Sequence, residues 1–252
     1  MNEIKQYGIS VYQEEYVEGD DWCAMLSRKL VKNGTNCIIW SADRDLTQLV
    51  QTNNNGNFCV CWSPFSSRNK YGHSMKLFVD NSPNNFNLMN PNYMSNYNLL
   101  KKICNLAECI DRINPHDVIV YKIFFGDVSD NIFCPLKIQR KTRLQSIPKK
   151  TFDLNVDIDT DDTFVKVINE NRSIYNNKLV NSDDEILEHL KYNRTLVTLD
   201  EKYYPKEIVD KLENSEEIRK FIDIDMLINK YNAENVETLN NNNNFTNILE
   251  TI

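Results

Sequence analysis

The sequence predicts an α/β fold, in which a parallel sheet with flanking helices precedes a mostly helical region. The first observation is the rhythm from Glu18 to Val50, where a helical pattern, a short apolar run and another helical pattern follow one another. That order is typical of an α/β layer. The second is that helix signals dominate beyond residue 98, with amphipathic spacing and a clear helix start.

The first element of the layer is predicted to be a helix. Residues 8–17 alternate loosely and fit either a short strand or a loop. Asp20 or Asp21 is then predicted to cap a helix, which Asn33-Gly34 ends with a glycine suited to a left-handed conformation. Its apolar positions recur at helical spacing and are Trp22, Met25, Leu26 and Leu30.

Strands are predicted next. Residues 37–40 form a short apolar run that fits a buried parallel strand, and residues 46–50 predict another helix. Apolar residues alternate over 58–62 and again over 77–79, which predicts a strand pair around a loop. Residues 81–98 are rich in asparagine and predict a surface connection.

The second half is predicted to be helical. Residues 99–110 have amphipathic spacing. Residues 114–117 read Asn-Pro-His-Asp, a helix-start signal that outweighs the strand propensity of residues 118–121. Further helices are predicted around residues 186–190 and 218–222, with a short one opened by Pro205.

Composition excludes several classes of protein. With 41% hydrophobic and 26% charged residues, the 252-residue chain resembles ordinary globular proteins. No apolar stretch approaches the roughly 20 residues that span a bilayer, so no membrane partner is expected. Seven cysteines without a CxxC pair and three histidines argue against a zinc site and predict reduced thiols in a cytoplasm.

Charge is segregated along the chain. The net charge of −7 argues against nucleic-acid binding by the whole surface. One stretch, however, contains six basic residues and no acid, so it fits either contacts with phosphates or a solvated helix face. These residues are Lys137, Arg140, Lys141, Arg143, Lys149 and Lys150.

Three acidic clusters are the candidate metal ligands. Each has a simpler interpretation, as a helix cap, a solvated turn or a polar loop. Together they fit divalent metal binding, because Mg²⁺ prefers oxygen ligands and two ions can promote hydrolysis of a phosphodiester. The clusters are Glu18-Gly19-Asp20-Asp21, Asp43-Arg44-Asp45 and Gly126-Asp127-Val128-Ser129-Asp130-Asn131.

The order and context of these clusters resemble the 5′-nuclease family of 5′–3′ exonucleases and flap endonucleases. Residues 18–21 resemble its Glu-Ala-Asp-Asp signature. Residues 39–49 resemble its strand, Ser-x-Asp-x-Asp turn and following helix. Residues 126–132 resemble the Gly-Asp-x-x-Asp-Asn-Ile motif of its helix–three-turn–helix, and the T-even bacteriophage ribonuclease H type is the most similar.

The resemblance implies a PIN-like fold and the roles of individual residues. Two Mg²⁺ ions are expected as cofactors, with Mn²⁺ as a substitute. The implied metal ligands are Glu18, Asp20, Asp21, Asp43, Asp45, Asp127 and Asp130. The residues expected to carry catalysis are Asp20, Asp43, Asp45 and Asp130. The implied DNA-binding residues are Asn131, Lys137, Arg140, Lys141 and Arg143.

Two departures from the family pattern stand out. Glycine replaces alanine at position 19, and no glycine follows Asn131-Ile132, where the family forms a phosphate-binding turn. The family's first metal-binding strand has no counterpart before Glu18. The chain is therefore expected to be a fragment or one product of a split gene, and to fold poorly without a separate chain that supplies that segment.

The expected function is metal-dependent hydrolysis of DNA or RNA–DNA hybrids at 5′ ends or flaps, in replication and repair. The alternative is a non-catalytic DNA-binding subunit that keeps the nuclease fold. Three regions are predicted: residues 1–98 as the carboxyl-terminal part of the α/β nuclease domain, 99–150 as the helix–three-turn–helix, and 151–252 as a mostly helical region. If the chain is phage-encoded, its location is the cytoplasm of the host cell.

Overall fold

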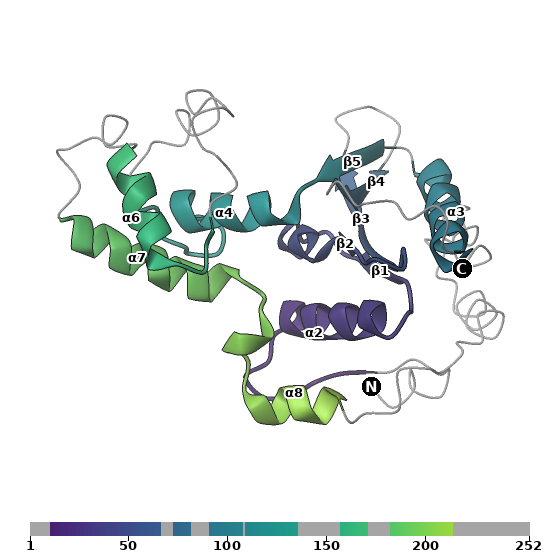
Figure 1. The fold of residues 1–252 in the computed structure, drawn as a ribbon, viewed down its shortest axis with the longest axis horizontal. Helices are drawn as coiled ribbons and strands as arrows, with labels where there is room; N and C mark the ends of the chain where they lie inside the picture. Colours follow the sequence, from purple (N-terminus) through teal and green to yellow (C-terminus); the bar gives the residue numbers. More distant parts are fainter. Residues whose placement is uncertain are drawn as a thin grey trace. The chain divides into compact units, whose positions relative to one another are not determined.

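Figure 1 shows the computed structural model of the chain, which describes residues 11–66, 73–81, 91–107, 109–135, 157–170 and 182–213. The chain divides into two units. Unit 1 comprises Met1–Arg112 and Tyr204–Ile252, and unit 2 comprises Ile113–Tyr203. Each unit has its own apolar core, and each is described by itself.

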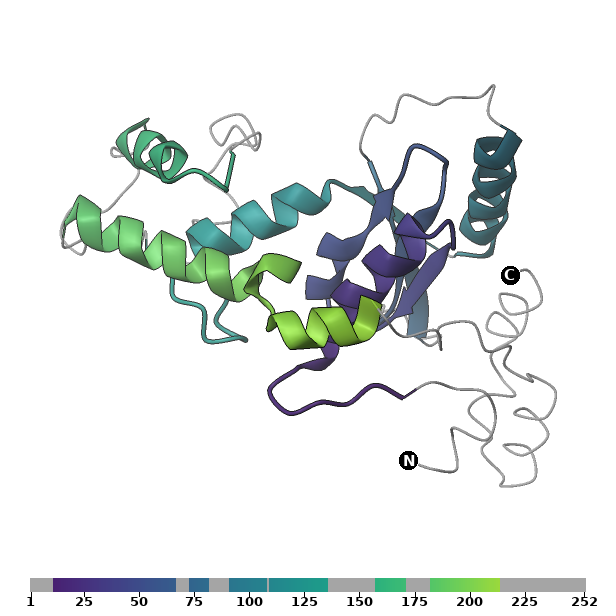
Figure 2. The same ribbon diagram turned by 60° about the horizontal axis from the view of Figure 1, so that its bottom comes forward.

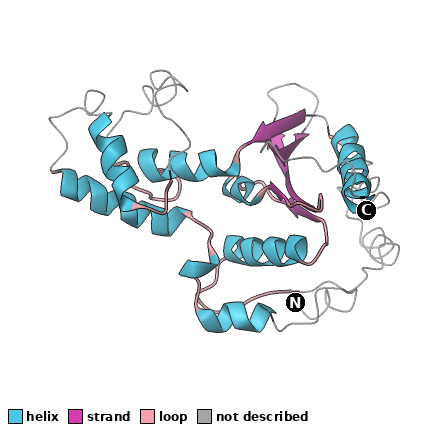
Figure 3. Ribbon diagram, viewed as in Figure 1, coloured by secondary structure: helices cyan, strands magenta, loops and turns pink. Residues whose placement is uncertain are grey.

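Unit 1 is built on a mixed β-sheet (Figure 3). The strand order is β1-β3-β4-β5, and β2 also pairs with β3. Strand β1 runs parallel to β3, whereas β2 and β4 run antiparallel to it. The strands are β1 (Cys37–Trp40), β2 (Gln51–Thr52), β3 (Phe58–Ser66), β4 (His73–Asp80) and β5 (Cys109–Ile113).

The α/β class is thus confirmed, and the predicted parallel pairing is present between β1 and β3, whereas β2 and β4 make the sheet a mixed one. The strand pair predicted around residues 58–62 and 77–79 is present as β3 and β4. These consecutive strands are joined too closely for the crossover of about a dozen residues that a parallel pair requires. The predicted parallel strand is present as β1, although only Ile39 is buried and Trp40 is 43% exposed.

The two faces of β3 pack against different helices. Phe58, Val60 and Trp62 alternate along the strand and pack with Ile103 of helix α3 (Pro91–Leu106). The cysteines between them point to the opposite face, since successive strand residues face opposite ways. There Cys59 lies beside Ser27 of helix α2 (Gly19–Lys32). Burial raises the pKa of the other cysteine on this face, Cys61, to about 12.

Helix α3 differs from its prediction at both ends. It begins at Pro91, within the segment predicted as a surface connection, because proline is well suited to the first helical position. It ends at Leu106, and Ile110 belongs to β5 instead. The residues of β5 alternate between partly buried and exposed, as in a strand with one solvated face.

Helices α2 and α8 pack side by side in unit 1 (Figures 1 and 2). Trp22 and Met25 of α2 contact Leu212 of α8 (Lys206–Glu213), the short helix predicted after Pro205. The Lys29 ammonium donates to the terminal carbonyls of α8, including Glu213 O at 3.1 Å. Gly34 has φ +80°, as predicted for the end of α2.

Unit 2 is helical and packs around α4 (Pro115–Phe125). Asn114 accepts a hydrogen bond from the backbone N–H of His116 at 3.2 Å, so the predicted helix start is confirmed. Helix α7 (Asp183–Val197) confirms the prediction around residues 186–190, whereas residues 218–222 lie outside the described residues. The core joins Phe124 of α4, Phe164 of α6 (Asp161–Glu170) and Leu190 of α7.

Among the helices that the structure describes, none is both long and apolar enough to cross a bilayer.

Replacing Asn114 by alanine is expected to lower the free energy of unfolding of unit 2 by about 1 kcal/mol, because the cap of α4 is lost. Urea unfolding followed by circular dichroism measures the change. Asn114→Ser is the control, since serine retains a capping oxygen. Equal losses in the two variants would contradict the capping role.

Candidate functional site

The acids of unit 1 lie at the start of α2 and just beyond β1. Glu18, rather than Asp20 or Asp21, is the N-cap of α2. The Asp21 carboxylate accepts the backbone N–H of Glu18 at 3.0 Å, and Asp20 Oδ1 accepts the N–H of Asp21 at 3.0 Å. Glu18 and Asp21 therefore help to begin the helix, because the first N–H groups of a helix have no partner within it.

Asp43 and Asp45 occupy a turn after β1 that is fixed by side-chain to backbone bonds. Ser41 Oγ accepts from the backbone N–H of Asp43 at 3.0 Å, and Asp43 Oδ1 accepts from the N–H of Asp45 at 2.9 Å. Asp45 begins a short 3₁₀ helix, η1 (Asp45–Leu49), close to the helix that was predicted over residues 46–50. Both carboxylates thus come from the carboxyl end of a strand, the edge at which α/β proteins place ligands.

The Asp20 carboxyl is affected by the other acids of unit 1. Burial raises the pKa of Asp20, and the negative charges of Asp21 and Asp43 raise it further, although backbone hydrogen bonds oppose the shift. Keeping Asp20 ionised therefore costs free energy in the absence of a cation. A bound cation would remove that cost.

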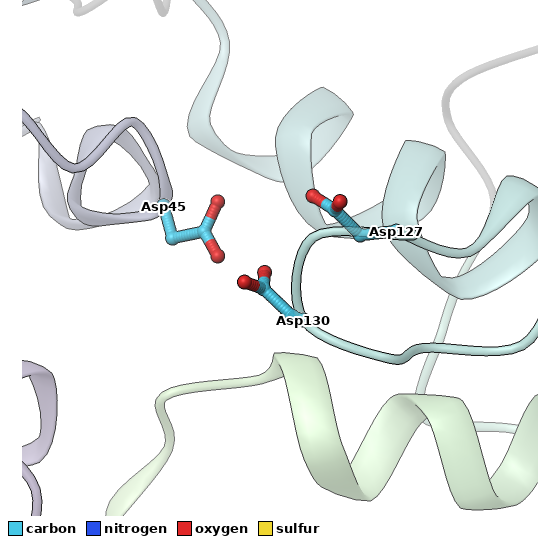
Figure 4. A group of neighbouring side chains, drawn as sticks. All are labelled: Asp45, Asp127 and Asp130. Atoms are coloured by element: carbon cyan, nitrogen blue, oxygen red, sulfur yellow. The ribbon is translucent and has the colours of Figure 1, made fainter.

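Asp127 and Asp130 lie in unit 2, on the loop between α4 and Ile132. Figure 4 shows the two side chains on this loop, and their oxygens lie within 4.8 Å of one another. The loop is closed by two backbone hydrogen bonds, from Asp127 N–H to Ile132 O at 3.0 Å and from Ile132 N–H to Asp127 O at 2.7 Å. Carboxylates at this spacing could hold a metal ion, although their geometry does not identify the metal.

Two residues with positive φ shape this loop. Gly126 ends α4 with φ 64° and ψ 179°, a conformation that is essentially restricted to glycine. Asn131 has φ 57°, and asparagine tolerates this left-handed region better than most residues. The predicted DNA-binding residue Asn131 thus has a structural role that explains its residue type.

Lys122 of α4 contacts the loop that carries Asp127 and Asp130, which is called the acidic loop below. The sequence did not indicate this role of the lysine. Its side chain is only 9% exposed, and Nζ lies 2.8 Å from Asp130 Oδ2 and 3.2 Å from Asp127 Oδ2. Partial burial raises the pKa of Asp127, but hydrogen bonds from Ser129 and the charge of Lys122 outweigh it, so the pKa is lowered overall. The one available signal was a lysine inside the apolar run 118–125.

The predicted site residues therefore lie in different parts of the structure. Asp43 and Asp45 share one turn of unit 1 and the charge of Asp43 affects the pKa of Asp20, whereas Asp127 and Asp130 form a pair in unit 2. Glu18 and Asp21 serve the start of α2. The predicted basic residues lie outside the described part of the chain, and they are Lys137, Arg140, Lys141 and Arg143.

The likeness to the 5′-nucleases rests on short motifs, and the chemistry of their side chains is that of hard-cation ligands. Comparisons with protein-family models, with curated proteins and with solved structures found no significant match to this chain.

Proposed function

We propose that this chain is a metal-dependent 5′-nuclease that hydrolyses phosphodiester bonds at 5′ ends or flaps of DNA or RNA–DNA hybrids. The observation that carries the proposal is the pair of carboxylates of Asp127 and Asp130 in unit 2, whose oxygens lie within 4.8 Å of one another. In unit 1, Asp20 and Asp43 belong to two motifs that are separate in the sequence, each lies where an element of the α/β layer begins or ends, and the charge of Asp43 helps to raise the pKa of Asp20. Like charges held together in this way are typical of sites for divalent cations.

The proposed cofactors are two Mg²⁺ ions, for which Mn²⁺ can substitute. The donor set fits them, since carboxylate oxygens are the ligands that these hard cations prefer. Bound cations of this kind lower the pKa of a water molecule and stabilise the leaving oxygen of a phosphodiester. The proposed role of the chain is to hold carboxylates for these cations, those of Glu18, Asp20, Asp21, Asp43 and Asp45 in unit 1 and those of Asp127 and Asp130 in unit 2.

The proposed partners are DNA and a separate chain. Lys137, Arg140, Lys141 and Arg143 are proposed to bind duplex phosphates, a contact independent of base sequence and weakened by salt. Strand β1 comes first in the order of the described sheet. We therefore propose that a strand of the second chain adds beside β1, as strands commonly add at a sheet edge.

The test is cleavage of a labelled 5′-flap duplex in Mg²⁺, with and without the polypeptide encoded by the upstream reading frame. Asp43→Asn and Asp130→Asn are each expected to slow cleavage by about 100-fold or more, equivalent to about 2.7 kcal/mol of transition-state stabilisation. Asp162→Asn, an exposed acid in the first turn of α6, is the control and should cleave like the wild type.

Two outcomes of this assay would contradict the nuclease. Cleavage that survives in both Asp43→Asn and Asp130→Asn would show that these acids are not needed. Flap binding without cleavage under both conditions would favour the second candidate, a non-catalytic DNA-binding subunit. One observation favours that candidate: Lys122 already neutralises part of the charge on Asp127 and Asp130.

A further inference from the structure

The ammonium of Lys122 is a buried cation that lies between Asp127 and Asp130 of the acidic loop. It lies in the last turn of α4, where the negative end of the helix dipole favours a positive charge. A buried ammonium is costly unless it is paired, and here two carboxylates share it. The pairing therefore fixes the lysine and both acids relative to one another.

Of the three charged side chains around the loop, that of Asp130 is the most exposed to solvent. Both Oδ2 atoms point to Lys122, while Asp127 Oδ1 accepts from the backbone N–H of Ser129 at 2.9 Å. The Asp130 side chain is 44% exposed, whereas that of Lys122 is 9% exposed. The ammonium thus holds the carboxylates from the protein side, and a cation from solvent can reach Asp130 from the other side.

This arrangement has two opposing effects on a divalent cation. Lys122 keeps the carboxylates at ligand spacing before a cation binds, which lowers the cost of ordering the loop. Its positive charge also repels the cation at short range, where Coulomb interactions are strong in a partly buried site. Repulsion between charges a few ångströms apart is the larger effect, so the lysine weakens cation binding overall.

We propose that Lys122 is a positioning residue that sets the divalent-cation affinity of the acidic loop. This inference rests on the proposed function, because it assigns a positioning residue to Asp127 and Asp130, two of the carboxylates proposed there as metal ligands. The lysine holds Asp127 and Asp130 together in the cation-free protein, and its charge restricts binding to high cation concentrations.

The test is Mn²⁺ binding to the full chain without DNA, measured by electron paramagnetic resonance. Lys122→Met keeps the length of the side chain and removes its charge, so Mn²⁺ is expected to bind at least tenfold more tightly. The thermal midpoint without metal should fall, and Mn²⁺ should raise it more than in the wild type. Lys122→Gln removes the charge but keeps a donor, and it should shift the affinity in the same direction.

Lys202→Met is the matched control. Lys202 also bridges two aspartates of unit 2, with Nζ 2.7 Å from Asp159 Oδ1 and 3.6 Å from Asp200 Oδ2. Its replacement should lower the thermal midpoint and leave Mn²⁺ binding unchanged. Asp130→Asn should weaken Mn²⁺ binding, which identifies the loop as the site measured.

Unchanged or weaker Mn²⁺ binding in both Lys122 variants would overturn the inference and leave Lys122 a purely structural residue. Absence of Mn²⁺ binding in the wild type and in both variants would overturn it too. Tighter binding in the variants together with no flap cleavage would support the role of Lys122 while contradicting the nuclease function. The metal measurement therefore separates the two proposals.

Discussion

Replacing Gly126 by alanine is expected to destabilise unit 2 by about 3 kcal/mol or more, the sum of backbone strain and overpacking. A Cβ at this position would lie 2.4 Å from Ile132 O and 2.7 Å from Phe133 O. Both are backbone atoms, so no side chain can move to relieve the clash. Gly126 is also in a conformation that L-residues rarely adopt, with φ 64° and ψ 179°. Guanidinium unfolding measures the loss.

The glycines of unit 1 provide graded controls for this prediction. Gly34 has φ +80° but no atom within 4 Å of its Cβ position, so Gly34→Ala should cost only about 1 kcal/mol of strain. Gly19 has an open Cβ position and is helical, so Gly19→Ala should be neutral or stabilise by about 0.5 kcal/mol. A loss for Gly126→Ala no larger than that for Gly34→Ala would show that the acidic loop can rearrange without cost.

Elements governed by local signals were predicted well. The start of α4 is set by Asn114 and Pro115, and the end of α2 by Gly34, so a few neighbouring residues determine each boundary. The alternation over 58–62 likewise reports which residues face the core, because strand side chains alternate between two faces. Such patterns act over a few residues and can be recognised in one sequence.

Elements governed by tertiary contacts were predicted less well. Ile110 is in phase with the apolar face of α3, and only its place in β5 shows that the helix has already ended. The direction of β4 depends on its pairing with β3, which periodicity does not report. The sequence therefore predicted β1, β3 and β4, but it predicted neither β5 nor the direction in which β4 runs.

The candidate site shows the same division. The acidic motifs and the turns that carry them could be located, because Asp43 and Asp127 make hydrogen bonds within a few residues of themselves. The role of Lys122 was missed, since it depends on the loop folding back beside α4. Glu18 and Asp21 stay predicted as ligands, and the structure adds that they help to begin α2.

Replacing Asn193 by aspartate is also expected to destabilise unit 2 strongly. Asn193 links three segments of this unit. It is fully buried in α7, and Nδ2 donates to Ile123 O at 2.9 Å and to Phe133 O at 2.8 Å. These carbonyls lie in α4 and just beyond the acidic loop. Asn193→Asp replaces the donor by a buried carboxyl that faces two carbonyl oxygens. The expected loss at pH 7 is about 3 kcal/mol or more.

The loss should depend on pH in a direction that identifies its cause. Burial without donors raises the pKa of the introduced carboxyl in the folded protein above its unfolded value of about 4. The unfolded chain therefore gives up this proton first, and the deficit should grow as the pH rises from 4 to 7. Asn193→Ala removes the same two hydrogen bonds without adding a charge, so its deficit relative to the wild type should not vary with pH over this range. Parallel urea titrations at both pH values test this, and a deficit for Asn193→Asp that does not change with pH would show that solvent reaches the introduced carboxyl.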